Sequence, residues 1–175
     1  DNDVNSFAAC DCKMGAGKKY KTYIVMTVGT GIGGAFVVNN KLWRGKDYNA
    51  GEIGRMLVDG VHWEKMASIT ALIKSAKLRE LDIEEGKDVF DLYDQGDRVA
   101  QLVVGEFYRN LGKGIANLVY IFNPEAIIIG GGVSAREGFG NEINAYADYY
   151  LVDGFQDTVD IIPAQFKNDG GILGA

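Results

Sequence analysis

The sequence predicts an α/β fold, and three features of the chain lead to that prediction. Residues 126–129 form a short all-apolar run, which is typical of a central strand covered on both faces. Residues 97–122 carry apolar side chains at three- and four-residue steps, which indicates a long helix with a buried face. Residues 23–28 and 35–38 are rich in β-forming side chains and flank a glycine-rich turn, so they favour a hairpin.

Composition limits the classes of protein that the chain can belong to. It has 175 residues, of which 47% are hydrophobic, so it can bury one core and form one domain or one lobe of a larger protein. The net charge is −6 and the basic residues are scattered singly, which argues against a nucleic-acid surface. The sequence opens with no signal peptide and has no apolar run near the ~20 residues that span a bilayer. We therefore expect a cytoplasmic protein without nucleic-acid or membrane partners.

The first segment predicts a helix over residues 4–14, because apolar residues recur there at helical spacing and Gly15 and Gly17 follow. Cys10 and Cys12 lie two positions apart, where helical side chains do not face one another. We interpret them as free thiols of a reducing compartment rather than as a disulfide or a shared metal site. The chain does not begin with Met, and both of its ends resemble cuts through a longer protein.

The hairpin turn over residues 29–34 has the sequence Gly-Thr-Gly-Ile-Gly-Gly. Its glycines lack the Cβ atoms that would keep an anion away from backbone N–H groups, and Thr27 and Thr30 offer hydroxyl donors. The pattern favours a phosphate site. A plain glycine-rich hairpin turn explains it equally well at this point, because short glycine patterns are weak evidence on their own.

The chain after the hairpin predicts a further turn, a strand and two helices. An Asn39–Asn40 turn, which tolerates positive φ, reverses the chain into residues 42–43. Residues 56–58 have the composition of a short strand. Apolar spacing then predicts a helix from residue 64 to about residue 81 and a shorter helix over residues 89–93.

The long helix predicted over residues 97–122 contains three glycines, Gly105, Gly112 and Gly114. Each of them costs roughly 1 kcal/mol of helix propensity relative to Ala. We therefore expect another element or a ligand to cross this helix closely where they lie. Pro124 ends the helix, because proline disfavours helical geometry in the residue before it.

Residues 126–129 lead directly into Gly130-Gly131-Gly132, and a helix is predicted over residues 139–151. A strand, a glycine turn and a helix in this order are how an α/β fold places a nucleotide at the carboxyl end of the strand. The alternative is a flexible loop without a ligand. A last strand is predicted over residues 159–164.

Four motifs in a fixed order resemble one protein family. They are Asn2-Asp3-Val4-Asn5, then Gly29-Thr30-Gly31-Ile32-Gly33-Gly34, then Ala50-Gly51-Glu52-Ile53-Gly54, and Asn123-Pro124-Glu125 leading into Ile129-Gly130-Gly131-Gly132-Val133-Ser134. Together they are similar to the ROK family of bacterial sugar kinases and sugar-responsive repressors, over essentially the whole chain. The resemblance implies a ribonuclease-H-like, actin-like ATPase lobe with a mixed β-sheet and flanking helices. It makes residues 1–175 the single large, carboxyl-terminal lobe of a two-lobed protein, with the small amino-terminal lobe absent from this chain.

The resemblance also assigns a sugar site. In the family's kinases the aspartate of the Asn-Asp pair is the catalytic base, which corresponds here to Asp3, and Asn2 would hold a neighbouring sugar hydroxyl. From the residues alone, Asp3 is better explained as a helix cap. Glu52 and Glu64 correspond to family glutamates that contact sugar hydroxyls, although a solvated loop acid is the alternative for Glu52.

For the nucleotide, the resemblance places Thr30 and Gly31 against the phosphates of ATP, and Gly131 and Gly132 near its adenosine. Magnesium is the implied metal cofactor. The family's first phosphate motif, Asp-x-Gly-Gly-Thr, helps to hold that ion and is absent from these residues. We therefore expect the isolated chain to be a poor catalyst or none.

The sequence departs from the family where a structural zinc site is usual. Typical members carry a histidine just after the Gly-Glu-x-Gly motif and then a cysteine-rich loop, but this chain has Arg55 at the first place and no cysteine over residues 57–63. One histidine and two distant cysteines cannot supply four zinc ligands. We expect no bound zinc, a surface or packing role for His62, and a similarity to the zinc-free branch of the family.

The leading hypothesis is an ATP- and magnesium-dependent kinase that phosphorylates a hydroxyl of a hexose or hexose derivative. The alternative is a sugar-sensing ROK repressor whose amino-terminal helix-turn-helix is missing from this chain. The missing cysteine loop and the retained Asn2-Asp3 pair favour the kinase. Because the family commonly associates through this lobe, a homodimer is expected.

Overall fold

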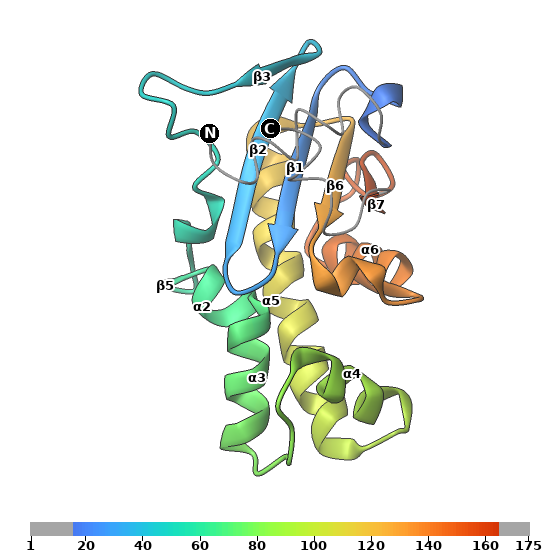
Figure 1. Ribbon diagram of the computed structural model, residues 1–175. Coiled ribbons are helices and arrows are strands. Elements are labelled where there is room, and N and C mark those ends of the chain that lie inside the picture. The colour runs from blue at the N-terminus through green and yellow to red at the C-terminus, as the bar shows by residue number, and fades with distance from the viewer. Residues whose placement is uncertain (1–15, 165–175) are drawn as a thin grey trace.

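The computed structural model describes residues 16–164. Asn2, Asp3, both cysteines and the helix predicted over residues 4–14 lie outside the described residues. The elements, shown in Figure 1, are in chain order η1 (Ala16–Lys19), β1 (Tyr23–Val28), β2 (Ile32–Val38), β3 (Lys41–Trp43), η2 (Ile53–Arg55), β4 (Leu57–Val58), β5 (Val61–His62), α2 (Glu64–Ala67), α3 (Ile69–Leu78), α4 (Gly86–Asp94), α5 (Arg98–Phe122), β6 (Ala126–Gly130), η3 (Gly132–Ala135), α6 (Phe139–Asp148) and β7 (Asp160–Pro163).

The main sheet is mixed, with the strand order β3-β2-β1-β6-β7. The hairpin strands β1 and β2 are antiparallel, as are β2 and β3, whereas β1 and β6 run parallel, as do β6 and β7. In the parallel pair, Thr27 lies opposite Gly130, so both strands end at the same edge of the sheet (Figure 1). The predicted strands over residues 23–28 and 126–129 are confirmed.

The two faces of the sheet are packed differently. Alternate residues of β1, such as Ile24 and Met26, belong to the large core that the helices cover. Tyr23 and Val25 point to the opposite face, where they join a smaller cluster. Because β1 and β6 lie inside the sheet with both faces covered, every residue of β6 is buried.

The long helix α5 lies behind the sheet in Figure 1, and most of its buried residues belong to the same large core as alternate residues of β1 and β6. It runs from Arg98 to Phe122, as its apolar spacing predicts. It starts after Asp97, whose carboxylate accepts hydrogen bonds from the backbone N–H groups of Val99 (2.9 Å) and Ala100 (2.8 Å). It ends at Asn123, which adopts the left-handed conformation with a φ of 42°.

At two of the three glycines of α5, another part of the chain packs so closely that a larger side chain would not fit. A Cβ atom at Gly112 would lie 2.7 Å from the backbone oxygen of Tyr146 in α6, and one at Gly114 would lie 2.0 Å from the ring of Trp63. At Gly105 the nearest atom would be the flexible end of Arg109, at 3.4 Å. The prediction of a close crossing is therefore confirmed for Gly112 and Gly114 and wrong for Gly105.

The structure corrects the predicted boundaries of two elements. Strand β2 begins at Ile32 rather than at residue 35, so Gly33 and Gly34 pair with β1 and the turn comprises residues 29–31 alone. The helix predicted from residue 64 to about 81 is divided into α2 and α3, because Ser68 adopts an extended conformation with a ψ of 165°. The Ser68 hydroxyl then accepts a hydrogen bond from the N–H of Ala71 and caps α3.

Other boundaries differ by a few residues. Helix α4 begins at Gly86 rather than at residue 89, since the Asp88 carboxylate accepts hydrogen bonds from the N–H groups of Glu84 and Glu85 and so caps an earlier turn. Helix α6 follows the glycine turn only after the short η3 helix and ends at Asp148. The short strand over residues 56–58 is confirmed as β4, which pairs with β5.

Candidate functional site

Two glycine-rich turns, about a hundred residues apart in the sequence, meet at the carboxyl edge of the sheet. The turn over residues 29–31 follows β1, and Gly131 follows the parallel strand β6. A Cβ atom at Gly131 would lie 2.3 Å from the backbone oxygen of Val28, the last residue of β1. The predicted phosphate residues Thr30 and Gly31 and the predicted adenosine residues Gly131 and Gly132 are thus brought to one edge.

The first turn is held by the amino terminus of α3. The backbone N–H of Ile69 donates a hydrogen bond to the carbonyl oxygen of Gly29, and the hydroxyl of Thr70 donates one to the carbonyl oxygen of Thr30, both at 2.8 Å. The Thr30 side chain itself is exposed. The positive end of a helix dipole and an exposed hydroxyl therefore lie beside glycines that leave the backbone open, which is a suitable environment for an anion.

A cavity of about 420 Å³ lies beside the second glycine turn. Its lining comes from the start of α3, from α4 and from η3: Ile69, Glu85, Gly86, Lys87, Phe90, Asp91, Asp94, Gly132, Val133, Ala135 and Arg136. Ile69 connects the cavity with the first turn, since its N–H binds Gly29 while the residue lines the cavity. This volume and the mixture of apolar and charged walls suit a heterocycle with a polar sugar attached.

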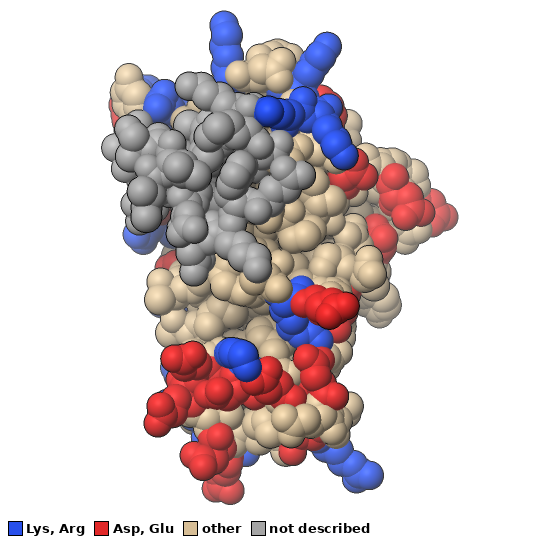
Figure 2. Space-filling view, turned by 45° about the vertical axis from the view of Figure 1, so that its right-hand side comes forward, with Lys and Arg blue, Asp and Glu red and all other residues tan. Residues whose placement is uncertain are grey.

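The charged side chains are unevenly distributed on this face of the molecule (Figure 2). Acidic side chains gather across the lower half of the view, where α4 lies in Figure 1, with a few basic ones among them, and a group of basic side chains projects from the opposite end. The acidic residues along α4 and just before it include Glu84, Glu85, Asp88, Asp91 and Asp94. A ligand in the cavity therefore meets carboxylates on the α4 side, and Lys87 and Arg136 are its basic lining residues.

Glu64 lies beside the first glycine turn. A Cβ atom at Gly31 would be 2.8 Å from its carboxylate oxygen Oε2, and one at Gly54 would be 3.3 Å from its Cβ. Gly54 in turn packs against the backbone oxygen of Ile32 in β2. The structure therefore brings Glu64, half-buried at the first position of α2, to the first glycine turn, where the phosphates are predicted.

Glu52 directly precedes η2 and is more exposed than Glu64. Its neighbour Gly51 has a φ of 99° and packs against the backbone oxygen of Gly34. Its own side chain is 53% exposed and accepts a hydrogen bond from Nε of Arg55 at 3.2 Å. Arg55 thus occupies the place where family members carry a histidine and pairs with the predicted sugar ligand.

Neither the α4 wall nor Arg136 was predicted from the sequence as part of the site. Arg136 lies directly after η3 and forms ion pairs with Asp94 and Glu142. Burial lowers the pKa of Arg136, but its hydrogen bond with Asp94 and the neighbouring carboxylate of Glu142 raise the pKa overall, so the side chain stays charged. Burial and the Glu142 carboxylate raise the pKa values of Tyr93 and Tyr108 beside it. Its place just after the glycine turn was the one available signal.

The predicted surface or packing role of His62 fits its position. It is exposed, and its Nδ1 lies 2.8 Å from the carbonyl oxygen of Arg55. Within residues 16–164, no group of three or more His, Cys, Asp or Glu residues is arranged to hold a metal ion. The absence of zinc stays a prediction, as do the roles of Asn2 and Asp3, which lie outside the described residues.

Comparison with known proteins agrees with this architecture. The mixed sheet with flanking helices is the ribonuclease-H-like, actin-like ATPase fold of sugar kinases. The chain belongs to the ROK family, whose sequence model matches residues 1–175. Relatives from Clostridium perfringens and Klebsiella pneumoniae, the second a beta-glucoside kinase, are 39% and 36% identical and are matched over 100% of this chain and 61% of their own. The chain therefore spans about three fifths of the length of these relatives.

Solved structures give the same family. A ROK family glucokinase from Streptomyces griseus, in complex with glucose and AMPPNP, matches with a TM-score of 0.90 and 31% identity over 99% of this chain and 65% of its own. A ROK family transcriptional regulator, a homologue of the Escherichia coli MLC protein, matches with a TM-score of 0.83 at 20% identity over 98% of this chain and 49% of its own, and so shares the fold. None of the helices formed by residues 16–164 is long and apolar enough to cross a membrane.

Proposed function

We propose that this chain is the larger lobe of a cytoplasmic, ATP-dependent kinase that transfers the γ-phosphoryl group of ATP to a hydroxyl of a hexose or hexose derivative. The observation that carries the proposal is the meeting of the two glycine turns beside a cavity of about 420 Å³. Relatives and structural neighbours that are named sugar kinases support the same reaction. The activity belongs to the intact protein.

The nucleotide would lie along the carboxyl edge of the sheet. Its phosphates would meet the hydroxyl of Thr30 and the open backbone at Gly31, and its adenosine would pass Gly131 and Gly132 into the cavity. Magnesium usually binds through the phosphates of a nucleotide and one or two carboxylates. When bound, the ion would neutralise phosphate charge during transfer.

The sugar would lie on the side of the first turn that faces α2. The carboxylate of Glu64 beside Gly31 can accept a hydrogen bond from a sugar hydroxyl close to the phosphates, and Glu52 can do so when it exchanges Arg55 for the sugar. Asn2 would hold a neighbouring hydroxyl. Asp3 would take the proton of the attacking hydroxyl, since a neutral hydroxyl is a weak nucleophile; this role rests on the family's Asn-Asp motif.

The test uses the intact protein, ATP with magnesium, and a panel of glucose, fructose, an amino sugar and a β-glucoside. We expect at least one sugar to be phosphorylated, and Asp3→Asn to lower kcat by roughly 10²- to 10⁴-fold because the general base is lost, with little change in AMPPNP affinity. Asp153→Asn, at an exposed aspartate, is the matched control. If Asp3→Asn turned over at a near-normal rate, the assignment of Asp3 as the base would be wrong. If the intact protein neither phosphorylated nor bound any of the sugars, the proposal of a sugar kinase would be wrong.

The second candidate, a sugar-sensing repressor, is favoured by the shared fold of the ROK transcriptional regulator alone. The full-length gene distinguishes the two. An upstream extension of ~100 residues, the size of a small lobe, supports the kinase, whereas a longer one with a helix-turn-helix supports the repressor. We also propose a homodimer without nucleic-acid contacts by this lobe, which sedimentation of the intact protein would test.

A further inference from the structure

Arg136 joins three elements that border the cavity. It lies immediately after η3, which continues the second glycine turn. Its Nη2 is 2.5 Å from Oδ1 of Asp94 at the end of α4, and its Nη1 is 2.5 Å from Oε2 of Glu142 in the first turn of α6. The side chain is 15% exposed, so these contacts are partly shielded from water.

Aromatic side chains of α4 fix the guanidinium from a further direction. The guanidinium carbon lies 5.4 Å from the ring centre of Phe90 and 5.3 Å from that of Tyr93, which are cation–π distances. The hydroxyl of Tyr93 also lies 3.5 Å from the Glu142 carboxylate. Arg136 is therefore held by a planar fork of donors and by two ring faces, which leaves little freedom for α4 to move relative to η3.

The cavity shares its walls with this arrangement. Phe90, Asp94 and Arg136 line it together with Gly132. A neutral side chain at position 136 would leave the carboxylates of Asp94 and Glu142 without this guanidinium, at the border of the cavity that is proposed to take the adenosine part of the nucleotide. Both the spacing of the walls and the local charge would then change.

We propose that Arg136 is a positioning residue for the nucleotide. By joining Asp94 of α4 to Glu142 of α6, it fixes the separation between α4 and the Gly131–Gly132 turn, and so the width of the adenosine cavity. The inference rests on the proposed function, in which this cavity takes the adenosine of ATP. Arg136 acts on the nucleotide through the walls and is not a catalytic residue.

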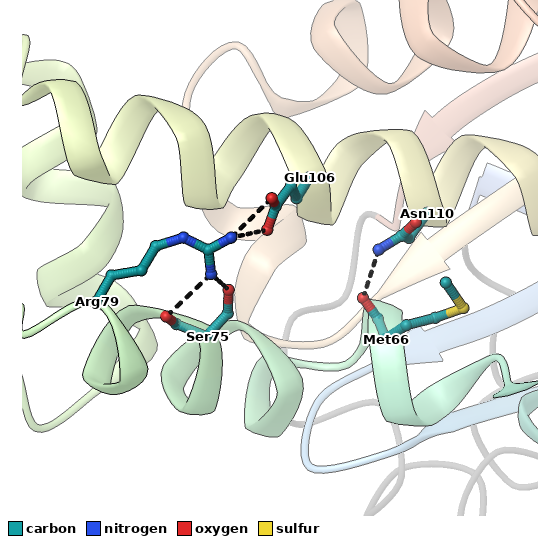
Figure 3. Close-up of polar contacts among 5 residues, drawn as sticks. All are labelled: Met66, Ser75, Arg79, Glu106 and Asn110. Carbon is teal, nitrogen blue, oxygen red and sulfur yellow. Dashed lines mark hydrogen bonds and ion pairs between the residues drawn. The ribbon is translucent and has the colours of Figure 1, made fainter.

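The experiment compares two arginines of the intact protein. Arg136→Met should weaken AMPPNP binding by about tenfold in calorimetry and raise the KM for ATP similarly, with the KM for the sugar nearly unchanged. Arg79→Met is the control. Arg79 joins the end of α3 to α5 through both oxygens of Glu106, at 2.7 and 2.9 Å, and also contacts Ser75 (Figure 3). It is not among the residues that line the cavity. The Arg79→Met variant should bind AMPPNP with the same affinity as the protein without substitutions.

Two further variants keep the test decisive if Arg136→Met does not fold. Asp94→Asn removes the charge at the α4 end while keeping the shape, and should also weaken AMPPNP binding. Arg136→Lys should restore part of the affinity, because an ammonium can pair with one carboxylate but lacks the fork. Unchanged affinity in the Asp94 and Arg136 variants, or an equal loss in Arg79→Met, would overturn this inference alone. Failure of the unchanged protein to bind AMPPNP would remove the proposed function and this inference with it.

Discussion

Gly131 and Gly132 are neighbours in the sequence but have different surroundings. Gly131 has a φ of 98° and a ψ of 174°, a region almost restricted to glycine, and a Cβ there would meet the backbone of Val28 at 2.3 Å. At Gly132 no atom lies within 4 Å of the place of a Cβ, and the residue lines the cavity. Gly131 is therefore required by the fold, whereas Gly132 borders open space in the cavity where the nucleotide is proposed to bind.

These surroundings predict different effects for two alanine substitutions. Gly131→Ala should lower the free energy of unfolding by about 1–3 kcal/mol, because the backbone is strained and the methyl group clashes. Gly132→Ala should change stability by less than ~0.5 kcal/mol and weaken AMPPNP binding, since its methyl group enters open space beside the cavity. Urea unfolding and calorimetry measure the two quantities. Equal stability loss in both variants would contradict the division of roles.

At the level of elements, α5 shows how a helix tolerates residues that disfavour it. Gly112 allows the backbone of α6 to approach, and Gly114 allows Trp63 to lie flat against the helix, where its indole N–H donates to the carbonyl oxygen of Asn110 at 2.8 Å. Trp63 immediately precedes α2, which carries Glu64. The packing of Gly114 therefore helps to place a proposed sugar ligand.

Alanine at two of these helix glycines should therefore act in opposite directions. Gly105→Ala should raise the free energy of unfolding by up to ~1 kcal/mol, because helix propensity improves and a Cβ atom would meet the flexible end of Arg109 at 3.4 Å and the Tyr146 hydroxyl at an ordinary contact distance of 3.7 Å. Gly114→Ala should lower it by about 1–3 kcal/mol or more, because the methyl group would overlap the Trp63 ring. Guanidinium unfolding of both variants is the measurement. A stabilising Gly114→Ala would show that Trp63 can move away without cost.

In the whole molecule, the site depends on segments that are far apart in the chain. The turn over residues 29–31, α4 and the segment from Gly131 to Arg136 surround one edge of the sheet. The β4–β5 hairpin, in contrast, forms a separate two-stranded sheet. One nucleotide should therefore affect the first three segments together.

Amide hydrogen exchange with and without AMPPNP tests this arrangement in the intact protein. At a ligand concentration a hundred times Kd, binding can stabilise the folded site by about 2.7 kcal/mol, so exchange in residues 29–31, 86–94 and 131–136 should slow together. The β4–β5 hairpin is the internal control and should exchange as before. Protection of one glycine turn without the other would contradict a shared nucleotide site.

The sequence by itself determined the elements whose signals are local. The apolar run of β6, the spacing along α5 and the Asn39–Asn40 turn, with φ values of 51° and 62°, each follow from side chains within a few residues of one another. The prediction of a phosphate site at the glycines also used only local geometry, and it stays a prediction. The break between α2 and α3 at Ser68 and the early start of β2 at Ile32 were not predicted. They depend on a side-chain cap and on pairing with β1, and the intrinsic propensities of the residues do not indicate either.

Only the tertiary structure decided which of these local features form a site. The parallel pairing of β1 with β6 brings two glycine turns together across a chain separation that no periodicity reveals. The wall formed by α4 and Arg136 likewise arises because α4 and α6 pack on the same long helix and place opposite charges in contact. Such contacts depend on the path of the chain through space, and side-chain patterns along the sequence record the faces that are buried but not the partners that bury them.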